Sequence, residues 1–113
     1  MKRQPALDLT SLAAQNCRAG APLLPAAELK RALAALPGWK HADKRLSKSY
    51  RFPDFHHTIG FVNALAWMAN EQDHHPDLSV HYAHLVVDWS THDAGGVTLN
   101  DCICAAKTEQ LAP

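Results

Sequence analysis

The spacing of apolar residues divides most of the chain into alternating helical and extended segments. After Pro25, leucines recur at helical spacing at Leu29, Leu33 and Leu36, and Pro37-Gly38 then provides a stop signal. Proline is well tolerated in the first turn of a helix, whereas a Pro-Gly pair cannot continue one. The pattern therefore predicts an amphipathic first helix.

A second, longer helix is predicted to begin after Pro53-Asp54. Its apolar positions recur at helical spacing, at Phe55, Ile59, Val62, Ala66 and Ala69. Pro76 disfavours helical geometry at His75 and cannot donate the next backbone hydrogen bond. We therefore expect this helix to end near His74.

Two pairs of short segments have the alternation or the β-branched and aromatic content of strands. Residues 39–43 and 46–52 should form one hairpin, in which Lys48 interrupts the apolar face of the second strand. Residues 78–83 and 85–91 should form another. The sequence thus predicts four short strands in two hairpins.

A last helix should follow Thr98, a residue type that commonly caps a helix N-terminus. The predicted order is then helix, two strands, helix, two strands, helix. This order predicts the α+β class, with a four-stranded antiparallel sheet and three helices packed on one face. The uncovered face or an edge strand would favour self-association.

The first 24 residues show little periodicity and contain Pro5, Gly20 and Pro22. Residues 1–24 are therefore predicted to be an extended or loosely docked N-terminal arm. Residues 25–113 are predicted to form a single domain, because 113 residues are too few for two domains of ordinary size.

Composition narrows the classes of function. Apolar residues make up 47% of the chain and charged residues 19%, as in globular proteins. Basic and acidic residues balance at 11 each, so no excess positive charge favours nucleic acid. No apolar run could span a bilayer, and Asp8, Gln15 and Asn16 interrupt the run that a signal peptide would need. We therefore do not expect the protein to bind nucleic acid, to insert into a membrane or to be secreted.

The cysteines form an odd set, Cys17, Cys102 and Cys104, which rules out a complete disulfide framework. Cys102 and Cys104 lie two apart on the predicted last helix, so their side chains should point to different faces and match a shared metal poorly. We expect buried, reduced thiols and a cytoplasmic protein.

Three histidines are the candidate catalytic residues of this sequence. His74 and His75 lie in Asp73-His74-His75-Pro76, where the second helix should end, and His92 lies in Ser90-Thr91-His92-Asp93 at the end of the last strand. Imidazoles titrate near neutral pH and suit acid–base catalysis. The alternative is a solvated helix terminus. Adjacent histidines diverge and no further ligands have metal-site spacing, so no metal is expected. Asp101 should lie in the first turn of the last helix, where a carboxylate interacts favourably with the positive end of the helix dipole.

Taken in order, these motifs resemble the signature of the pterin-4a-carbinolamine dehydratases. The resemblance covers roughly residues 24–110. The segments that carry it are Pro37-Gly38-Trp39, Phe52-Pro53-Asp54-Phe55, Asp73-His74-His75-Pro76, Tyr82, Ser90-Thr91-His92-Asp93 and Asp101. It implies the same fold, assembled as a homodimer or homotetramer, and no metal or organic cofactor.

Family members dehydrate 4a-hydroxytetrahydrobiopterin to the quinonoid dihydropterin and so recycle the pterin cofactor of aromatic amino-acid hydroxylases. The resemblance implies a catalytic set of His74, His75 and His92. It also implies that the side chains that bind or orient the pterin are Asp73, Ser90, Thr91 and Asp93. Elimination of the hydroxyl needs an acid to protonate the departing water and a base to take a nitrogen proton, and imidazoles can supply both.

One position departs from the family pattern. Many members have a glutamate four residues before the first histidine, where this chain has Asn70, with Glu71 beside it. An amide can still accept a hydrogen bond but brings no negative charge to a histidine. Two alternative functions remain open: a non-catalytic protein-binding member resembling transcriptional coactivators, and a relative that acts on molybdopterin-type pterins.

Overall fold

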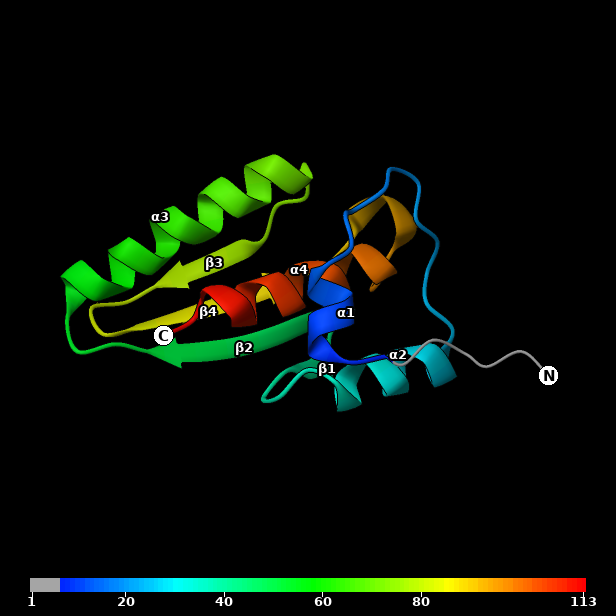
Figure 1. Cartoon of the computed structure of the whole chain (residues 1–113), viewed down its shortest axis with the longest axis horizontal. Helices are drawn as coiled ribbons and strands as arrows, with labels where there is room; N and C mark the ends of the chain where they lie inside the picture. The colour runs from blue at the N-terminus through cyan, green and yellow to red at the C-terminus, as the bar shows by residue number, and fades with distance from the viewer. Residues whose placement is uncertain (1–6) are drawn as a thin grey trace.

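Four antiparallel strands form one sheet in the computed structural model, which describes residues 7–113. The strands lie in the order β1-β2-β4-β3 (Figure 1). Their bounds are Lys40–Ala42 for β1, Arg45–Arg51 for β2, Asp77–Val80 for β3 and His84–Trp89 for β4. The two predicted hairpins are joined by the pairing of β2 with β4, in which Leu46 lies opposite Trp89 and Tyr50 opposite Leu85.

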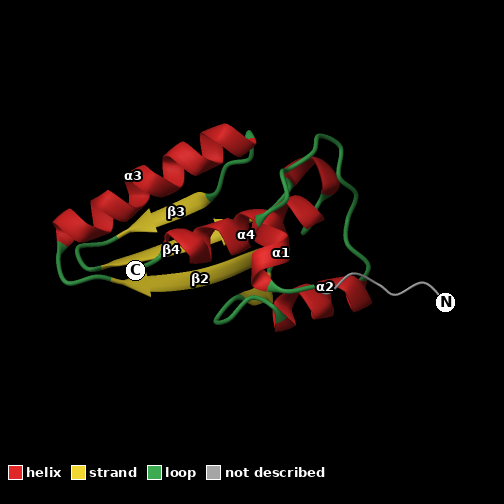
Figure 2. Cartoon of the chain, in the orientation of Figure 1, coloured by secondary structure: helices red, strands yellow, loops and turns green. Residues whose placement is uncertain are grey.

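Helices pack on one face of this sheet, as the α+β prediction required (Figure 2). Their bounds are Leu9–Ala13 for α1, Ala26–Ala34 for α2, Phe55–Gln72 for α3 and Leu99–Leu111 for α4, with a short 3-10 helix, η1, at His92–Ala94. The α2, α3 and α4 helices correspond to the three predicted helices, and the helix and strand order is confirmed. The α4 helix lies against β2, β4, α3 and α1.

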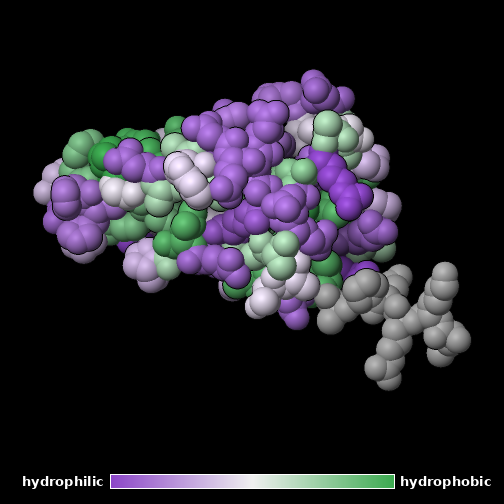
Figure 3. Space-filling view, turned by 45° about the horizontal axis from the view of Figure 1, so that its top comes forward, coloured by the Kyte–Doolittle hydropathy of each residue, from purple (hydrophilic) through white to green (hydrophobic). Residues whose placement is uncertain are grey.

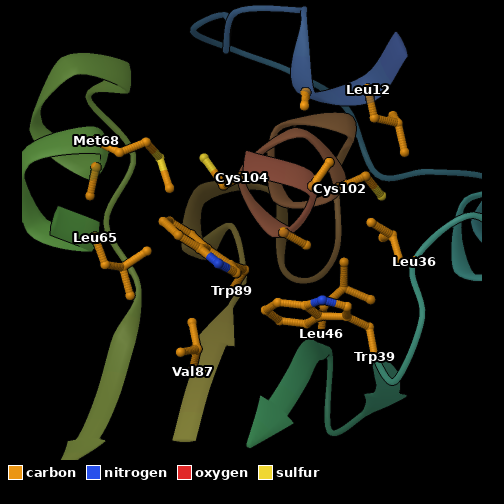
Figure 4. Close-up of a cluster of buried hydrophobic side chains, with 14 of the residues drawn as sticks. Leu12, Leu36, Trp39, Leu46, Leu65, Met68, Val87, Trp89, Cys102 and Cys104 are labelled. Carbon is orange, nitrogen blue, oxygen red and sulfur yellow. The ribbon is translucent and has the colours of Figure 1, made fainter. Parts of the chain in front are cut away.

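The core lies between α4 and the sheet. Trp89, Val87 and Leu46 are fully buried on the sheet side (Figure 4). From the helix side, small residues such as Cys104 and Ala105 are also fully buried. Because small side chains let the α4 backbone approach the sheet closely, the large indole of Trp89 is completely enclosed.

Lys48, which interrupts the apolar alternation of β2, forms an ion pair at the edge of this core. Its Nζ lies 2.7 Å from Glu109 Oε1 on α4 and donates to the Pro37 carbonyl at 2.8 Å. The Tyr50 hydroxyl donates to the other oxygen of Glu109. The apolar stem of Lys48 therefore packs inward while its charge is paired.

The N-terminal segment differs from its prediction. Within residues 7–24 the chain forms α1 instead of an extended or loosely docked arm, and Leu12 is fully buried against α4. Asp8 caps α1 through a reciprocal pair of hydrogen bonds with Ser11. Five helical residues are too few to produce a detectable period in the sequence. Residues 1–6 of the predicted arm lie outside the described part.

The buried face of α3 also differs from its prediction. The expected stripe contained Phe55 and Ala66, which are exposed. Of the predicted stripe, Ala69 is fully buried, but the other buried residues of α3 were not in it: Thr58, Phe61, Leu65 and Met68. Apolar residues occupy more than one side of α3, so periodicity alone did not identify the packed side. Phe55 stacks on Tyr82 at the surface, with ring centroids 6.3 Å apart.

The surface has an apolar end. Figure 3 shows hydrophobic side chains gathered toward the left end of the molecule, where α3 begins in Figure 1, and hydrophilic ones over the middle. Large apolar side chains that are exposed on α3 and the β3–β4 hairpin are Phe55, Trp67, Val80 and Tyr82. None of the helices in residues 7–113 combines the length and apolar character needed to cross a membrane.

Candidate active site

The end of α3 turns His74 toward the interior. Asp73 adopts a left-handed conformation with φ of 50° and ends the helix. The His74 amide then donates to the Ala69 carbonyl at 3.2 Å, and Pro76 prevents a further turn. Only 13% of the His74 side chain is exposed. Its ring stacks on Trp89, with centroids 5.6 Å apart and planes 16° apart.

A buried carboxylate from α4 holds this imidazole. Asp101 Oδ1 lies 2.6 Å from His74 Nε2, and the Asp101 side chain has no exposed surface. Its other oxygen, Oδ2, accepts hydrogen bonds from the Thr98 amide at 2.9 Å and from the Thr91 hydroxyl at 2.8 Å. Asp101 lies in the first turn of α4, as predicted, and forms a capping box with Thr98.

The carboxylate changes the acidity of His74. The hydrogen bond to Asp101 raises the pKa of His74 above its ordinary value, because it stabilises the charged ring, while partial burial opposes the rise. Near neutral pH, the fold therefore favours a protonated imidazole at this position. Such a group can donate a proton to a ligand.

A cavity of about 790 Å³ opens beside His74. Four residues predicted for the site line it together: Asp73, His74, Thr91 and Asp93. Its other walls come from the end of α3, from α4 and from residues 17–23. The structure thus brings one predicted catalytic histidine and three predicted binding residues to a single hollow.

The remaining predicted residues lie apart from this cavity. Ser90 and His92 line a smaller hollow of about 310 Å³, to which Thr91 also contributes. His75 is exposed and lines neither hollow; its Nε2 lies 3.0 Å from Asn70 Oδ1. The amide at position 70 therefore contacts one of the three histidines of the predicted catalytic set, as an amide is able to do. The three histidines do not share one of these hollows.

The segment of residues 14–24, here called the strap, lies within the predicted arm, but its place in the wall of the His74 cavity was not predicted. Gln72 Oε1 accepts from the Cys17 amide at 2.8 Å. The Asn100 side chain accepts from the Arg18 amide at 2.9 Å and donates to the Arg18 carbonyl at 2.7 Å. These contacts join positions 55 and 82 residues apart, which local patterns cannot detect. Within residues 7–113, no group of three or more metal-ligating side chains is gathered.

The fold defines the class as a small α+β protein, in which a buried carboxylate holds a histidine beside the sheet. The chain belongs to the family described as pterin 4 alpha carbinolamine dehydratase, whose model matches residues 22–111. The family resemblance seen in the sequence is thereby confirmed.

Bacterial relatives cover most of the chain. A protein from Chromobacterium violaceum is 61% identical over 83 residues, which are 74% of this chain and 77% of the relative. A protein from Stenotrophomonas maltophilia is 50% identical over 109 residues, covering 92% of this chain and 94% of the relative. Both carry the provisional name pterin-4-alpha-carbinolamine dehydratase.

Two solved structures share the fold. One, described as a transcriptional coactivator/pterin dehydratase from Brucella melitensis, is 35% identical with a TM-score of 0.76, covering 80% of this chain and 98% of its own. The other is a pterin dehydratase-like protein described as a RuBisCO assembly factor in the alpha-carboxysome. It is 23% identical with a TM-score of 0.58, over 66% of this chain and 89% of its own, and shows the fold alone.

Proposed function

We propose that the chain dehydrates 4a-hydroxytetrahydrobiopterin to quinonoid dihydropterin and water, acting on the pterin that an aromatic amino-acid hydroxylase releases. The observation that carries this proposal is the pair of His74 and buried Asp101 at the edge of the cavity. Family membership supplies the substrate class, and the pair supplies a group suited to proton transfer.

The cavity suits a fused bicyclic ligand with several N–H groups. Its volume of about 790 Å³ is within the range of small-molecule sites. Asp73 and Asp93 on its lining offer carboxylate oxygens that can accept from the amino group and ring nitrogens of a pterin. These two side chains are the proposed binding and orienting groups, together with Thr91 and, from the neighbouring hollow, Ser90.

The chemistry requires one proton to be delivered and one to be removed. The hydroxyl leaves the 4a carbon as water after it receives a proton, and a base removes a proton from a ring nitrogen whose electrons form the new double bond to carbon. His74, whose raised pKa favours the imidazolium form, is the proposed acid. The exposed imidazoles of His75 and His92 are the proposed groups that accept and exchange the second proton.

A dehydration assay on single histidine variants tests this proposal. His75→Ala and His92→Ala should each lower kcat by on the order of 100-fold, the usual effect of losing an acid–base group. His74→Gln should do the same while keeping a hydrogen-bond donor for Asp101. His56→Ala is the matched control, because His56 is exposed at the opposite end of α3, and its rate should equal that of the unmodified protein.

The rate of quinonoid dihydropterin formation, followed by absorbance, provides the measurement. A protein that does not accelerate this step at all would exclude the proposed function. A protein that does, with unchanged rates in both His75→Ala and His92→Ala, would exclude the proposed roles of these histidines.

A protein-binding function is the second candidate. The exposed aromatic side chains of Trp67 and Tyr82, 68% and 69% accessible, favour it because large apolar groups at a surface commonly contact partners. The Brucella melitensis relative is also described as a coactivator. This function predicts that partner binding survives the histidine substitutions and is lost in Trp67→Ala or Tyr82→Ala.

A further inference from the structure

Two thiols meet where the strap crosses α4. Cys17 Sγ on the strap lies 3.4 Å from Cys104 Sγ on α4, although 87 residues separate them. Both are free thiols in the structure. The third thiol, Cys102, points to the opposite side of α4, toward Leu36 (Figure 4). The prediction that Cys102 and Cys104 point to different faces of α4 is confirmed. The sulfur that lies next to Cys104 is that of Cys17.

Hydrogen bonds on both sides of the two sulfurs hold Cys17 close to Cys104. The Cys17 amide donates to Gln72 on α3, and the adjacent Arg18 backbone makes two hydrogen bonds with Asn100 on α4. Lys107 Nζ donates to the Ala13 carbonyl at 2.7 Å and so fastens α1, which precedes the strap, to the same helix. Because these contacts surround the sulfurs, little chain entropy remains to be lost when they join.

The two thiols differ in access and acidity. Cys17 is partly exposed and lines the His74 cavity, whereas Cys104 is fully buried. A hydrogen bond from Cys104 lowers the pKa of Cys17 against the opposing effect of burial, and the nearby His74 charge lowers it further. The hydrogen bond to Cys17 and burial both raise the pKa of Cys104. Cys17 is thus the sulfur that a small oxidant can reach as a thiolate.

We propose that Cys17 and Cys104 are a modification site, a thiol pair that hydrogen peroxide converts to a disulfide, fastening the strap to α4 at the edge of the His74 cavity. The sulfurs must close from 3.4 Å to about 2.05 Å. The strap can supply this movement, because it is a surface segment with mostly exposed residues.

The reaction proceeds in two balanced steps. The Cys17 thiolate attacks one peroxide oxygen, the O–O bond breaks, and hydroxide leaves, giving a sulfenic acid on Cys17. Cys104 sulfur then attacks Cys17 sulfur, the S–O bond breaks, and the departing hydroxyl takes the Cys104 proton to leave as water. The hydroxide from the first step takes up the proton that Cys17 released when it ionised. In total, peroxide is reduced to two waters while two thiols are oxidised to one disulfide.

The bond would change the cavity in two ways. It would fix the position of the strap residues that form one wall, and it would remove the ionisable thiol of Cys17 from the neighbourhood of His74. Any effect on dehydration rests on the proposed function, whereas disulfide formation does not. The two are therefore measured separately.

The first experiment maps the thiols of the full-length protein after exposure to hydrogen peroxide and alkylation. We expect a mass loss of two hydrogens per chain, a linked peptide pair containing Cys17 and Cys104, and recovery of all thiols with dithiothreitol. Cys102→Ala should form the same link, whereas Cys17→Ser should not. Cys104→Ala should instead accumulate a dimedone-reactive sulfenic acid at Cys17.

A second measurement follows the strap itself. Trypsin should cleave after Arg18 in reduced protein, and oxidation should slow this cleavage by about tenfold or more because opening of the strap is restrained. Cleavage in the β1–β2 turn at Lys44-Arg45 is the internal control and should not change. In Cys17→Ser, peroxide should have no effect at Arg18.

Three results would overturn the proposal. The first is that all three thiols stay free although the same peroxide oxidises added glutathione. The others are a disulfide from Cys17 to a second chain, and unchanged trypsin cleavage after Arg18 in the linked protein. Turnover of the pterin should fall by about tenfold or more on oxidation and recover on reduction. Absence of turnover in the reduced protein would instead contradict the proposed function and leave the thiol result standing.

Discussion

The carboxylate of Asp101 connects three parts of the chain that are remote in sequence. It accepts from His74 at the end of α3, from Thr91 after β4 and from the Thr98 amide at the start of α4. With no exposed surface, the charge depends entirely on these donors. Its removal should therefore affect both stability and the acidity of His74.

Asp101→Asn should lower the free energy of unfolding by about 3 kcal/mol, since it leaves a charged or unpaired partner in a mostly buried site. The loss should be larger at pH 5.5 than at pH 8.5. The pKa of His74 is raised in the folded protein, so its contribution is full below the unfolded value of about 6.5 and disappears as the pH rises through the folded value. Urea unfolding at both pH values measures the difference.

Asp93→Asn is the control for this experiment. Asp93 is an exposed carboxylate on the same cavity, so its substitution should change the free energy of unfolding by less than about 0.5 kcal/mol at either pH. An Asp101→Asn variant with the same loss of stability at pH 5.5 and 8.5 would show that His74 is not the group whose protonation Asp101 stabilises.

The sequence predicted which residues gather around one cavity better than it predicted their contacts. The motif order drew attention to Asp73, His74, Thr91 and Asp93, and these four do line one cavity. The hydrogen bond between His74 and Asp101 joins a residue just after α3 to one in the first turn of α4, 27 positions later, and only folding brings them together. For the same reason, the contact of Cys17 with Cys104 could not be deduced from spacing.

Among the elements, β2 and α4 are joined by a polar cluster in an otherwise apolar interface. Glu109 on α4 pairs with Lys48 at 2.7 Å and accepts from the Tyr50 hydroxyl, and its side chain is only 9% exposed. Burial, followed by the bond to Glu109, raises the pKa of Tyr50, so the phenol stays protonated as the donor.

Glu109→Ala should lower the free energy of unfolding by about 3 kcal/mol, because it strands the Lys48 ammonium and the Tyr50 hydroxyl in a largely buried interface. Gln110→Ala, the exposed neighbour on α4, should change it by less than about 0.5 kcal/mol. Urea denaturation at pH 7 gives both values. Equal stabilities for the two variants would mean that the cluster adds nothing to the β2–α4 contact.

Local signals predicted the elements where they act within a few residues. Asp54 caps α3 by accepting from the His57 amide at 2.9 Å, and Thr98 caps α4, at the positions that turn and capping residues indicated. The side of α3 that packs on the core was largely mispredicted, because it depends on contacts with aromatic rings from other elements. Phe61 packs on Tyr50, with centroids 5.2 Å apart, while Phe55 remains outside.

For the whole molecule, the order of helices and strands was sufficient to predict the α+β class, because two hairpins separated by a helix have few ways to form one sheet. It could not predict that residues 7–24 fold back on α4. The burial of Leu12 there depends on contacts with a helix nearly 90 residues later in the chain, which spans Leu99–Leu111.

The family resemblance implies that the chain assembles as a homodimer or homotetramer. The indole of Trp67 on α3 is 68% exposed, and β3, at one edge of the sheet, is followed by the exposed side chain of Tyr82. We expect multi-angle light scattering at about 50 µM to give at least twice the 12.4 kDa mass of one chain.

Trp67→Lys should reduce this mass, because a charge at an apolar contact loses its hydration without gaining a partner. Glu71→Lys, an exposed site four residues later on α3, should leave the mass unchanged. A Trp67→Lys protein with the unmodified mass would exclude this part of α3 from the contact between chains, and a monomeric unmodified protein would exclude the assembly itself.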